Sequence, residues 1–132
     1  MIKGGGGALL REKIVANASN KLYIVVDSTK TKSFLGRFPL PIEIESFGWQ
    51  HTKKLVESFN CSIKLRVFNN KTFITDNKNF ILDCYFEKIK YPNKLSKDLN
   101  QIPGVIENGI FSNMVDRVFV GYPNGKVNKI KE

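Results

Sequence analysis

Close to the start of the chain, four consecutive glycines are followed directly by good helix formers, and this junction constrains the fold more than any other stretch. Glycines are costly inside a helix or a strand, so Gly4 to Gly7 suit a loop whose backbone passes close to another group. Residues 8–13 all favour a helix. A glycine loop that enters a helix leaves backbone N–H groups unpaired, and such groups can bind a phosphate, an oxyanion or a polar sugar edge.

Two charged side chains, Lys3 and Glu12, bracket this loop. At helical spacing Glu12 shares a face with small and apolar residues, namely Ala8, Leu9, Val15 and Ala16. Desolvation on such a face favours the protonated form of a carboxylic acid, which makes it a usable base near neutral pH. The alternative is a solvated helix residue behind a flexible tail, and no P-loop Gly-Lys-Ser/Thr follows. This stretch alone slightly favours that alternative.

The composition is that of a basic globular chain. Its 132 residues, 42% of them hydrophobic, are enough for one domain, or for one domain and part of another. The net charge of +9 would attract phosphate-bearing ligands, nucleic acid or acidic membranes. The lysines are scattered among many Asn and Ile residues, however, so compositional bias explains the charge better than nucleic-acid binding. No signal peptide or long apolar run is present, and we expect a cytoplasmic protein without membrane contact.

The residues that most often bind metals are few and badly spaced for it. Cys61 and Cys84 match no metal-binding pattern, and we expect buried free thiols in a reducing compartment. His51 has no partner that would indicate a metal site or a catalytic triad. We therefore predict no metal site.

A helix over residues 8–19 should precede a strand over residues 22–26, whose continuous apolar run is typical of a parallel sheet. In open α/β sheets ligands bind at the carboxyl ends of the strands. Lys30 lies just beyond that end and is a candidate anion contact, although position alone favours a surface lysine equally. A second buried-type strand over residues 116–122 is placed in the same sheet.

The middle of the chain predicts a separate unit that begins after the stiff Phe38-Pro39-Leu40-Pro41 segment. Its element order is βαββαβ, the ferredoxin-like split pattern. The predicted elements are a half-buried strand at 42–46, a helix at 49–60, a strand at 62–68, hairpin arms at 73–75 and 80–86, a helix at 92–99 and a strand at 105–111. The prediction is thus an α/β fold with this small unit inserted.

Short motifs occur in order from residue 2 to about residue 125, and together they resemble ribose-5-phosphate isomerase of the A type. They are Ile2-Lys3-Gly4-Gly5-Gly6-Gly7-Ala8-Leu9 with Arg11-Glu12-Lys13, Val26-Asp27-Ser28 with Lys30, Leu35-Gly36 before Phe38-Pro39-Leu40-Pro41, Thr75-Asp76-Asn77, Ile81-Leu82-Asp83, and Ile102-Pro103-Gly104-Val105 with Gly109 and Phe111. One such motif would be weak evidence, but so many in register are specific.

The resemblance implies interconversion of ribose 5-phosphate and ribulose 5-phosphate through an enediolate, as in the pentose phosphate pathway, without a metal or organic cofactor. By the motif match, Glu12 would be the general base that moves a proton between C1 and C2, with Lys3 beside it as a catalytic cation. The resemblance assigns contacts with the phosphorylated pentose to Lys3, Gly4, Gly5, Gly6 and Lys30.

The resemblance also implies a domain organisation. Residues 1–39 and 115–132 would be a remnant of a catalytic domain with a Rossmann-like parallel sheet, and residues 40–114 a ferredoxin-like lid that also supports dimers or tetramers. The family carries a further N-terminal portion with a Ser/Thr-rich phosphate loop and an Asp-Gly-Ala-Asp stretch, so we expect a fragment with exposed apolar strand faces. Lys78 replaces the family's usual turn glycine, at a cost of about 1 kcal/mol.

Three hypotheses follow. The first is the C-terminal part of an isomerase, active only when the missing segment is supplied. The second is a catalytically inactive remnant that serves at most as an oligomerisation module. The third is a basic module that binds nucleic acid, but the aromatic strand pattern of such modules is absent. The ordered motifs favour the first, with no nucleic-acid partner.

Overall fold

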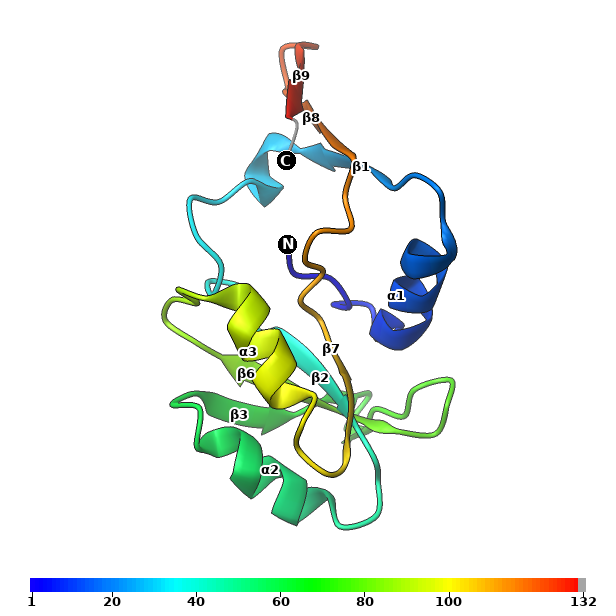
Figure 1. Cartoon of the computed structure of the whole chain (residues 1–132), viewed down its shortest axis with the longest axis vertical. Coiled ribbons are helices and arrows are strands. Elements are labelled where there is room, and N and C mark those ends of the chain that lie inside the picture. The colour runs from blue at the N-terminus through cyan, green and yellow to red at the C-terminus, as the bar shows by residue number, and fades with distance from the viewer. Residues whose placement is uncertain (131–132) are drawn as a thin grey trace.

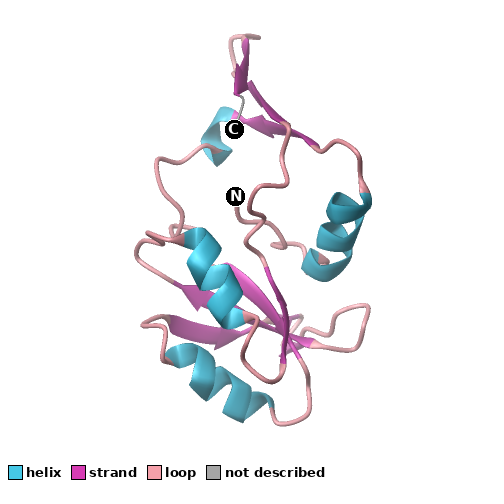
Figure 2. Ribbon diagram, viewed as in Figure 1, coloured by secondary structure: helices cyan, strands magenta, loops and turns pink. Residues whose placement is uncertain are grey.

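A computed structural model describes residues 1–130 and shows a mixed α/β protein with parallel and antiparallel strands (Figures 1 and 2). This confirms the predicted α/β class. The elements in chain order are α1 (Leu9–Ala18), β1 (Tyr23–Asp27), the 3₁₀ turn η1 (Ser28–Lys30), β2 (Leu40–Ile44), α2 (Trp49–Glu57), β3 (Ser62–Leu65), β4 (Val67–Phe68), β5 (Lys71–Thr72), β6 (Phe80–Tyr85), α3 (Pro92–Leu99), β7 (Val105–Asn108), β8 (Arg117–Gly121) and β9 (Val127–Ile130).

The segment from β2 to β7, residues 40–108, forms what we call the antiparallel unit. Its main sheet has the strand order β3-β6-β2-β7, and every neighbouring pair is antiparallel. Together with α2 and α3, this is the predicted βαββαβ order of elements. Figure 1 shows this unit below the rest of the chain.

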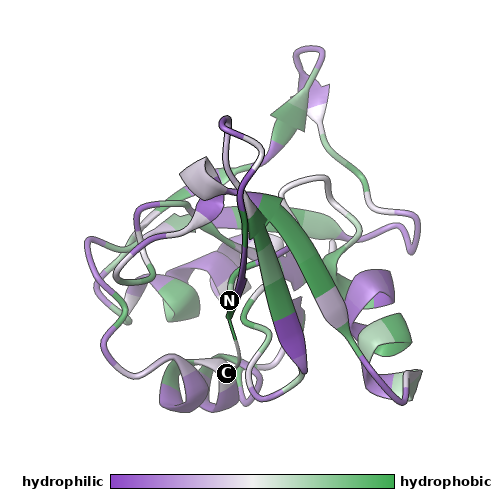
Figure 3. Cartoon of the chain, turned by 90° about the horizontal axis from the view of Figure 1, so that it is seen from above, coloured by the Kyte–Doolittle hydropathy of each residue, from purple (hydrophilic) through white to green (hydrophobic). Residues whose placement is uncertain are grey.

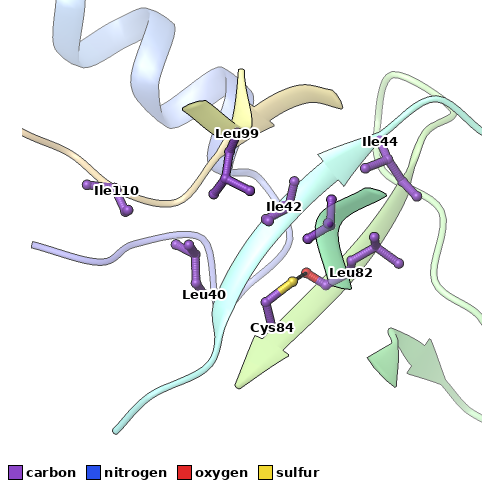
Figure 4. Packing of buried hydrophobic residues seen from close by; sticks show 8 residues of the cluster. Leu40, Ile42, Ile44, Leu82, Cys84, Leu99 and Ile110 are labelled. Carbon is purple, nitrogen blue, oxygen red and sulfur yellow. Dashed lines mark hydrogen bonds between the residues drawn. The ribbon is translucent and has the colours of Figure 1, made fainter. Parts of the chain in front are cut away.

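A single apolar core holds the antiparallel unit together (Figure 4). Strand residues from β2 and β6 meet one residue from each helix and one that follows β7. Burying an aliphatic side chain of this size stabilises a fold by about 1.5–3 kcal/mol. The buried residues are Leu40, Ile42, Ile44, Val56, Leu82, Cys84, Leu99 and Ile110.

Strand β2 differs from the prediction in both position and burial. It starts and ends two residues before the predicted 42–46 segment, and all five of its residues are buried, so the half-buried assignment was wrong. The cause is that α1 also packs against β2 and β7, which covers the second face of the sheet. Glu43 is only 1% exposed, and its carboxylate accepts hydrogen bonds from Thr75 Oγ1 and Asn79 Nδ2, both at 2.9 Å.

The predicted strand over 62–68 is interrupted at Arg66. Its backbone N–H donates to the Ile81 carbonyl at 2.8 Å, while its carbonyl accepts from the Phe73 N–H at 2.9 Å. Beyond it, β4 and β5 form a small hairpin, so the predicted arm over 73–75 was wrong. Asn69 and Asn70 both have positive φ, which a tight hairpin turn requires.

What we call the mixed sheet has the strand order β1-β8-β9. The parallel pairing of β1 and β8 confirms the predicted parallel pair, whereas the antiparallel β9 was not predicted. Strand β1 lies at the edge, and Val25 is 79% exposed. Figure 3, which looks down on this end of the molecule, shows green apolar segments in its strands together with purple hydrophilic ones. The expected exposure of apolar strand faces is thus confirmed for β1, whereas Val120 of β8 is fully buried.

The two cysteines are free, but only Cys84 is fully buried, so the prediction of two buried thiols was half right. A hydrogen bond with the Cys61 thiol, together with burial, raises the pKa of Cys84. The same hydrogen bond lowers the pKa of Cys61. Within residues 1–130, no helix has the length and apolar character needed to cross a membrane.

Candidate active site around the glycine loop

The glycine loop is fixed to the antiparallel unit. The Lys3 N–H donates to the Gly109 carbonyl, and the Phe111 N–H donates to the Met1 carbonyl, each at 2.9 Å. Gly109 allows this close approach, because a Cβ atom there would lie 2.4 Å from the Lys3 carbonyl oxygen. The alternative of a flexible glycine tail was therefore wrong.

The loop then turns sharply into α1. Its turn is closed by a hydrogen bond from the Gly7 N–H to the Gly4 carbonyl at 3.0 Å. Gly4 has φ +97°, and a Cβ atom there would lie 2.5 Å from the Leu9 Cβ. Helix α1 starts at Leu9, and the side chain of its N-cap residue accepts no hydrogen bond from the first N–H groups of the helix.

Lys3, just before the glycine loop, and Glu12, in the helix that follows it, form an ion pair. The distance from Lys3 Nζ to Glu12 Oε2 is 3.3 Å, and the two side chains are 35% and 37% exposed. Among residues 1–130, no group donates a hydrogen bond to the buried Glu12 Oε2. The Lys3 ammonium lies beside it as an ion-pair partner, without hydrogen-bond geometry. The structure therefore brings together the predicted carboxylate, the predicted cation and the loop.

Polar contacts on either side of Glu12 fix the orientation of α1. Lys13 Nζ donates to Glu107 Oε1 at 2.8 Å and to the Asn108 carbonyl at 2.5 Å. Arg11 pairs with Asp76 at 3.1 Å on the turn before β6. These contacts tie α1 to the antiparallel unit and point the intervening Glu12 toward Lys3.

Arg66 is the site residue that sequence reasoning missed. Its guanidinium donates from Nη1 to the carbonyl oxygens of Gly4 at 3.1 Å and Gly5 at 3.2 Å. Nε donates to Asp83 Oδ2 at 2.9 Å, and Nη2 pairs with the other carboxylate oxygen. Residues 62–68 were predicted as one continuous strand, and no local signal indicated a contact between Arg66 and a loop some sixty positions earlier.

Lys30 lies apart from these residues. It belongs to η1, where the Asp27 carboxylate caps the turn by accepting from the Thr29 N–H at 2.8 Å. Hydrogen bonds from the Thr29 hydroxyl and backbone lower the pKa of Asp27. Lys30 lines a hollow at the carboxyl ends of β1 and β8, on the opposite side of the molecule from α1 in Figure 1. In the part of the chain that the structure describes, no hydrogen bond or ion pair joins Lys30 to Lys3 or Glu12.

A second hollow lies between the start of α1 and the turn before β6, where Arg11 and Glu43 contribute to its lining. Neither hollow is lined by Lys3 or Glu12, so the candidate site is defined by the ion pair and the loop rather than by a closed cavity. Among residues 1–130, His, Cys, Asp and Glu form no group of three or more that could hold a metal ion.

The fold and the site define a mixed α/β protein with a carboxylate–ammonium pair at a glycine-rich, donor-bearing loop. Residues 1–125 match the family model of ribose 5-phosphate isomerase A, also called phosphoriboisomerase A. The chain belongs to this family. It is 52% identical over 126 residues to the ribose-5-phosphate isomerase A of Bacillus mycoides, an alignment that covers 95% of this chain and 57% of the relative.

Solved structures agree with this assignment. The ribose 5-phosphate isomerase of Plasmodium falciparum superposes with a TM-score of 0.95 at 35% identity, over all of this chain and 59% of that one. A D-ribose-5-phosphate isomerase in complex with phospho-erythronic acid superposes with a TM-score of 0.94 at 40% identity, over all of this chain and 58% of that one. The chain thus spans a little more than half the length of these relatives.

Proposed function

We propose that this chain carries the proton-transfer half of a ribose-5-phosphate isomerase active site. The single observation that carries the proposal is the ion pair of Lys3 and Glu12 at the mouth of the glycine loop. Family membership supplies the reaction class, an aldose–ketose isomerisation of a phosphorylated pentose. The phosphorylated sugar acid bound to a relative belongs to the same ligand class and supports this choice.

In the proposed mechanism, the Glu12 carboxylate removes the proton from C2 of ribose 5-phosphate and returns it to C1. Negative charge develops on a sugar oxygen during the first transfer. The Lys3 ammonium and the loop N–H groups of Gly5 and Gly6 stabilise that charge, because fixed donors need no reorganisation during the reaction. The remaining hydroxyl proton passes from O2 to O1, and we propose no metal or organic cofactor for either transfer.

We assign Lys30 a second contact with the substrate. Its place at the carboxyl ends of the parallel strands β1 and β8 supports this role, since α/β sheets bind ligands at that edge. A compact ammonium there suits a phosphate or hydroxyl group of the pentose.

The domain roles are part of the proposal. Residues 40–114 would act as a lid and oligomerisation domain in a dimer or tetramer, and residues 1–39 with 115–132 would belong to a larger Rossmann-like sheet. The ferredoxin-like strand order and the exposed apolar residues of β1 support this division. The free thiols Cys61 and Cys84 support a reducing, cytoplasmic setting.

The second candidate is an inactive oligomerisation module, which the coverage of little more than half of the relatives favours. To decide, residues 1–132 would be joined to the part of the Bacillus mycoides relative that this chain does not cover. We expect this joined chain to isomerise ribose 5-phosphate, and Glu12→Gln to reduce kcat by about 10²–10⁴-fold.

Glu57→Gln is the matched control, since Glu57 lies on α2 and its carboxylate makes an exposed ion pair with Lys53. It should leave turnover unchanged. A folded joined chain without turnover would favour the inactive module. Full turnover in the Glu12→Gln variant would exclude Glu12 as the base.

A further inference from the structure

We propose that Arg66 is a positioning residue, which holds the glycine loop so that the N–H groups of Gly5 and Gly6 face the reacting oxygens. The inference rests on the proposed function for its chemistry, but its geometric part can be tested without turnover. On this proposal the antiparallel unit contributes a residue that orients the site, in addition to the proposed role of the unit as a lid.

Hydrogen bonds on both edges of the guanidinium fix the contact between Arg66 and the loop. Nη1 of Arg66 bridges the carbonyl oxygens of Gly4 and Gly5, at 3.1 and 3.2 Å. The opposite edge of the guanidinium is held in a two-point fork by Asp83 on β6. The Arg66 and Asp83 side chains are only 13% and 16% exposed. Such a charge-assisted, bidentate pair fixes the plane and direction of the guanidinium.

Peptide geometry converts this contact into an orientation of donors. In a planar trans peptide, the carbonyl of one residue and the N–H of the next point in opposite directions. Because the Gly4 and Gly5 carbonyls point at Arg66, the N–H groups of Gly5 and Gly6 must point away from it. Within the described residues these two N–H groups donate to no other protein group, and both glycines are exposed.

A loop of glycines needs an external clamp of this kind. Glycine populates positive and negative φ with similar ease, so peptide groups between glycines reorient at little cost. The hydrogen bond from Gly7 to Gly4 fixes one carbonyl, but the Gly5 carbonyl has Arg66 as its partner. Without Arg66 the donors would sample several directions, and stabilisation by fixed donors would weaken.

Arg66 is itself fixed by the strand break described above. Its backbone N–H and carbonyl are both paired, and its guanidinium lies 5.9 Å from the centre of the Phe73 ring. The same ring lies against Gly7, where an added Cβ atom would come within 2.3 Å of it. The interruption at Arg66, where the Phe73 N–H pairs with the Arg66 carbonyl, therefore places both side chains next to the glycine loop.

The kinetic test uses Arg66→Gln in the joined chain. We expect kcat to fall about 10- to 100-fold with a smaller change in KM, because substrate contacts remain while donors lose their orientation. Arg66→Lys should recover part of the loss, since one ammonium cannot serve both Asp83 and the two carbonyls. Lys64→Gln is the control: it removes one positive charge from an exposed position on β3, two residues before Arg66, where Lys64 contacts the Tyr85 ring.

The geometric test uses the 132-residue chain itself and needs no activity. We expect Arg66→Gln to shift the amide NMR signals of Gly5 and Gly6, and Lys64→Gln to leave them in place. If Arg66→Gln does not fold, Asp83→Asn loosens the same fork and should move these signals in the same direction.

The outcomes separate the two proposals. A wild-type joined chain without turnover, combined with shifted glycine amides in Arg66→Gln, would reject the proposed function and retain the clamp. Unchanged glycine amides in a folded Arg66→Gln or Asp83→Asn chain would overturn the clamp, as would an unchanged kcat in a joined Arg66→Gln chain with turnover. If Arg66→Gln lowers stability but leaves kcat per folded molecule unaltered, Arg66 has a structural role and does not position the loop for the reaction.

Discussion

The antiparallel unit and the mixed sheet are built from similar strands but differ in what covers them. In the antiparallel unit, helices pack on the sheet, and central strand residues such as Ile42 and Leu82 are fully buried. In the mixed sheet, β1 forms an edge, and Tyr23 and Val25 remain exposed. The comparison shows that the same apolar strand pattern gives a closed core only where a second layer is present.

The candidate site is divided between these two regions. Lys3, the glycine loop and Glu12 are fastened to the antiparallel unit through Gly109, Lys13 and Arg66. Lys30 belongs to η1, which follows β1 of the mixed sheet. The proton-transfer part of the proposed site is therefore held by the closed region, whereas the proposed second substrate contact depends on the exposed one.

The largest expected effect tests the closed core directly. Leu82→Ala should lower the free energy of unfolding by about 2–5 kcal/mol, because it leaves a cavity in a closed core. Val25→Ala removes side-chain volume from an exposed strand and should change stability by less than about 0.5 kcal/mol. Urea denaturation of both variants would measure the difference. Equal losses would contradict the division into a closed and an exposed region.

A second prediction concerns the glycine loop, which is fastened to the closed antiparallel unit. Gly4→Ala should destabilise the chain by about 1–3 kcal/mol, because alanine is strained at positive φ and its Cβ would collide with Leu9. Gly6→Ala is the stability control, since a Cβ atom there meets nothing within 4 Å. Thermal denaturation would rank the two variants. A Gly4→Ala chain as stable as Gly6→Ala would indicate a mobile loop.

A smaller gain is expected at the turn before β6. Lys78 has φ 67°, which confirms the predicted left-handed conformation at this position. Lys78→Gly should relieve this strain and raise the free energy of unfolding by about 1 kcal/mol. Lys71→Gly, at a β5 position that needs no glycine, should not stabilise the chain. Urea denaturation midpoints of the two variants would check this prediction. A similar gain in stability at both positions would exclude backbone strain at Lys78 as the cause.

The smallest effect is a pH dependence confined to the mixed sheet. Because the folded pKa of Asp27 lies below its ordinary value of 3.8, its capping contribution is present above pH 3.8 and is lost as the pH falls through the folded pKa. The Thr29 amide signal should therefore titrate below pH 3.8, and this titration should vanish in Asp27→Asn. A Thr29 amide that does not respond to acid would show that the turn needs no carboxylate.

Local spacing accounts for what could be predicted from the sequence. The βαββαβ order follows from apolar periodicity, and the pairing of Lys3 with Glu12 follows from a loop that turns directly into a helix. Glu43, by contrast, lies in a strand that was predicted to be half-buried, and its burial depends on α1 covering the second face of the sheet. The contact of Arg66 with the loop could not be predicted, because its partners Gly4, Gly5 and Asp83 are distant in sequence.

The strands of the mixed sheet were only partly predictable from the sequence. Its parallel pair was predictable from two apolar runs, but β9 consists of exposed residues with little periodic signal. Residue patterns therefore identified strands that pack in a core better than the strand that only extends a sheet.

The most direct measurement is exchange of the C2 proton of ribose 5-phosphate with solvent deuterium, followed by NMR in the joined chain. If Glu12 is the base, the wild-type joined chain exchanges this proton, and Glu12→Gln exchanges it about 10²–10⁴-fold more slowly while Glu57→Gln matches the wild type. Exchange at the wild-type rate in a folded Glu12→Gln chain would contradict the assignment of Glu12 and, with it, the proposed role of the Lys3–Glu12 pair.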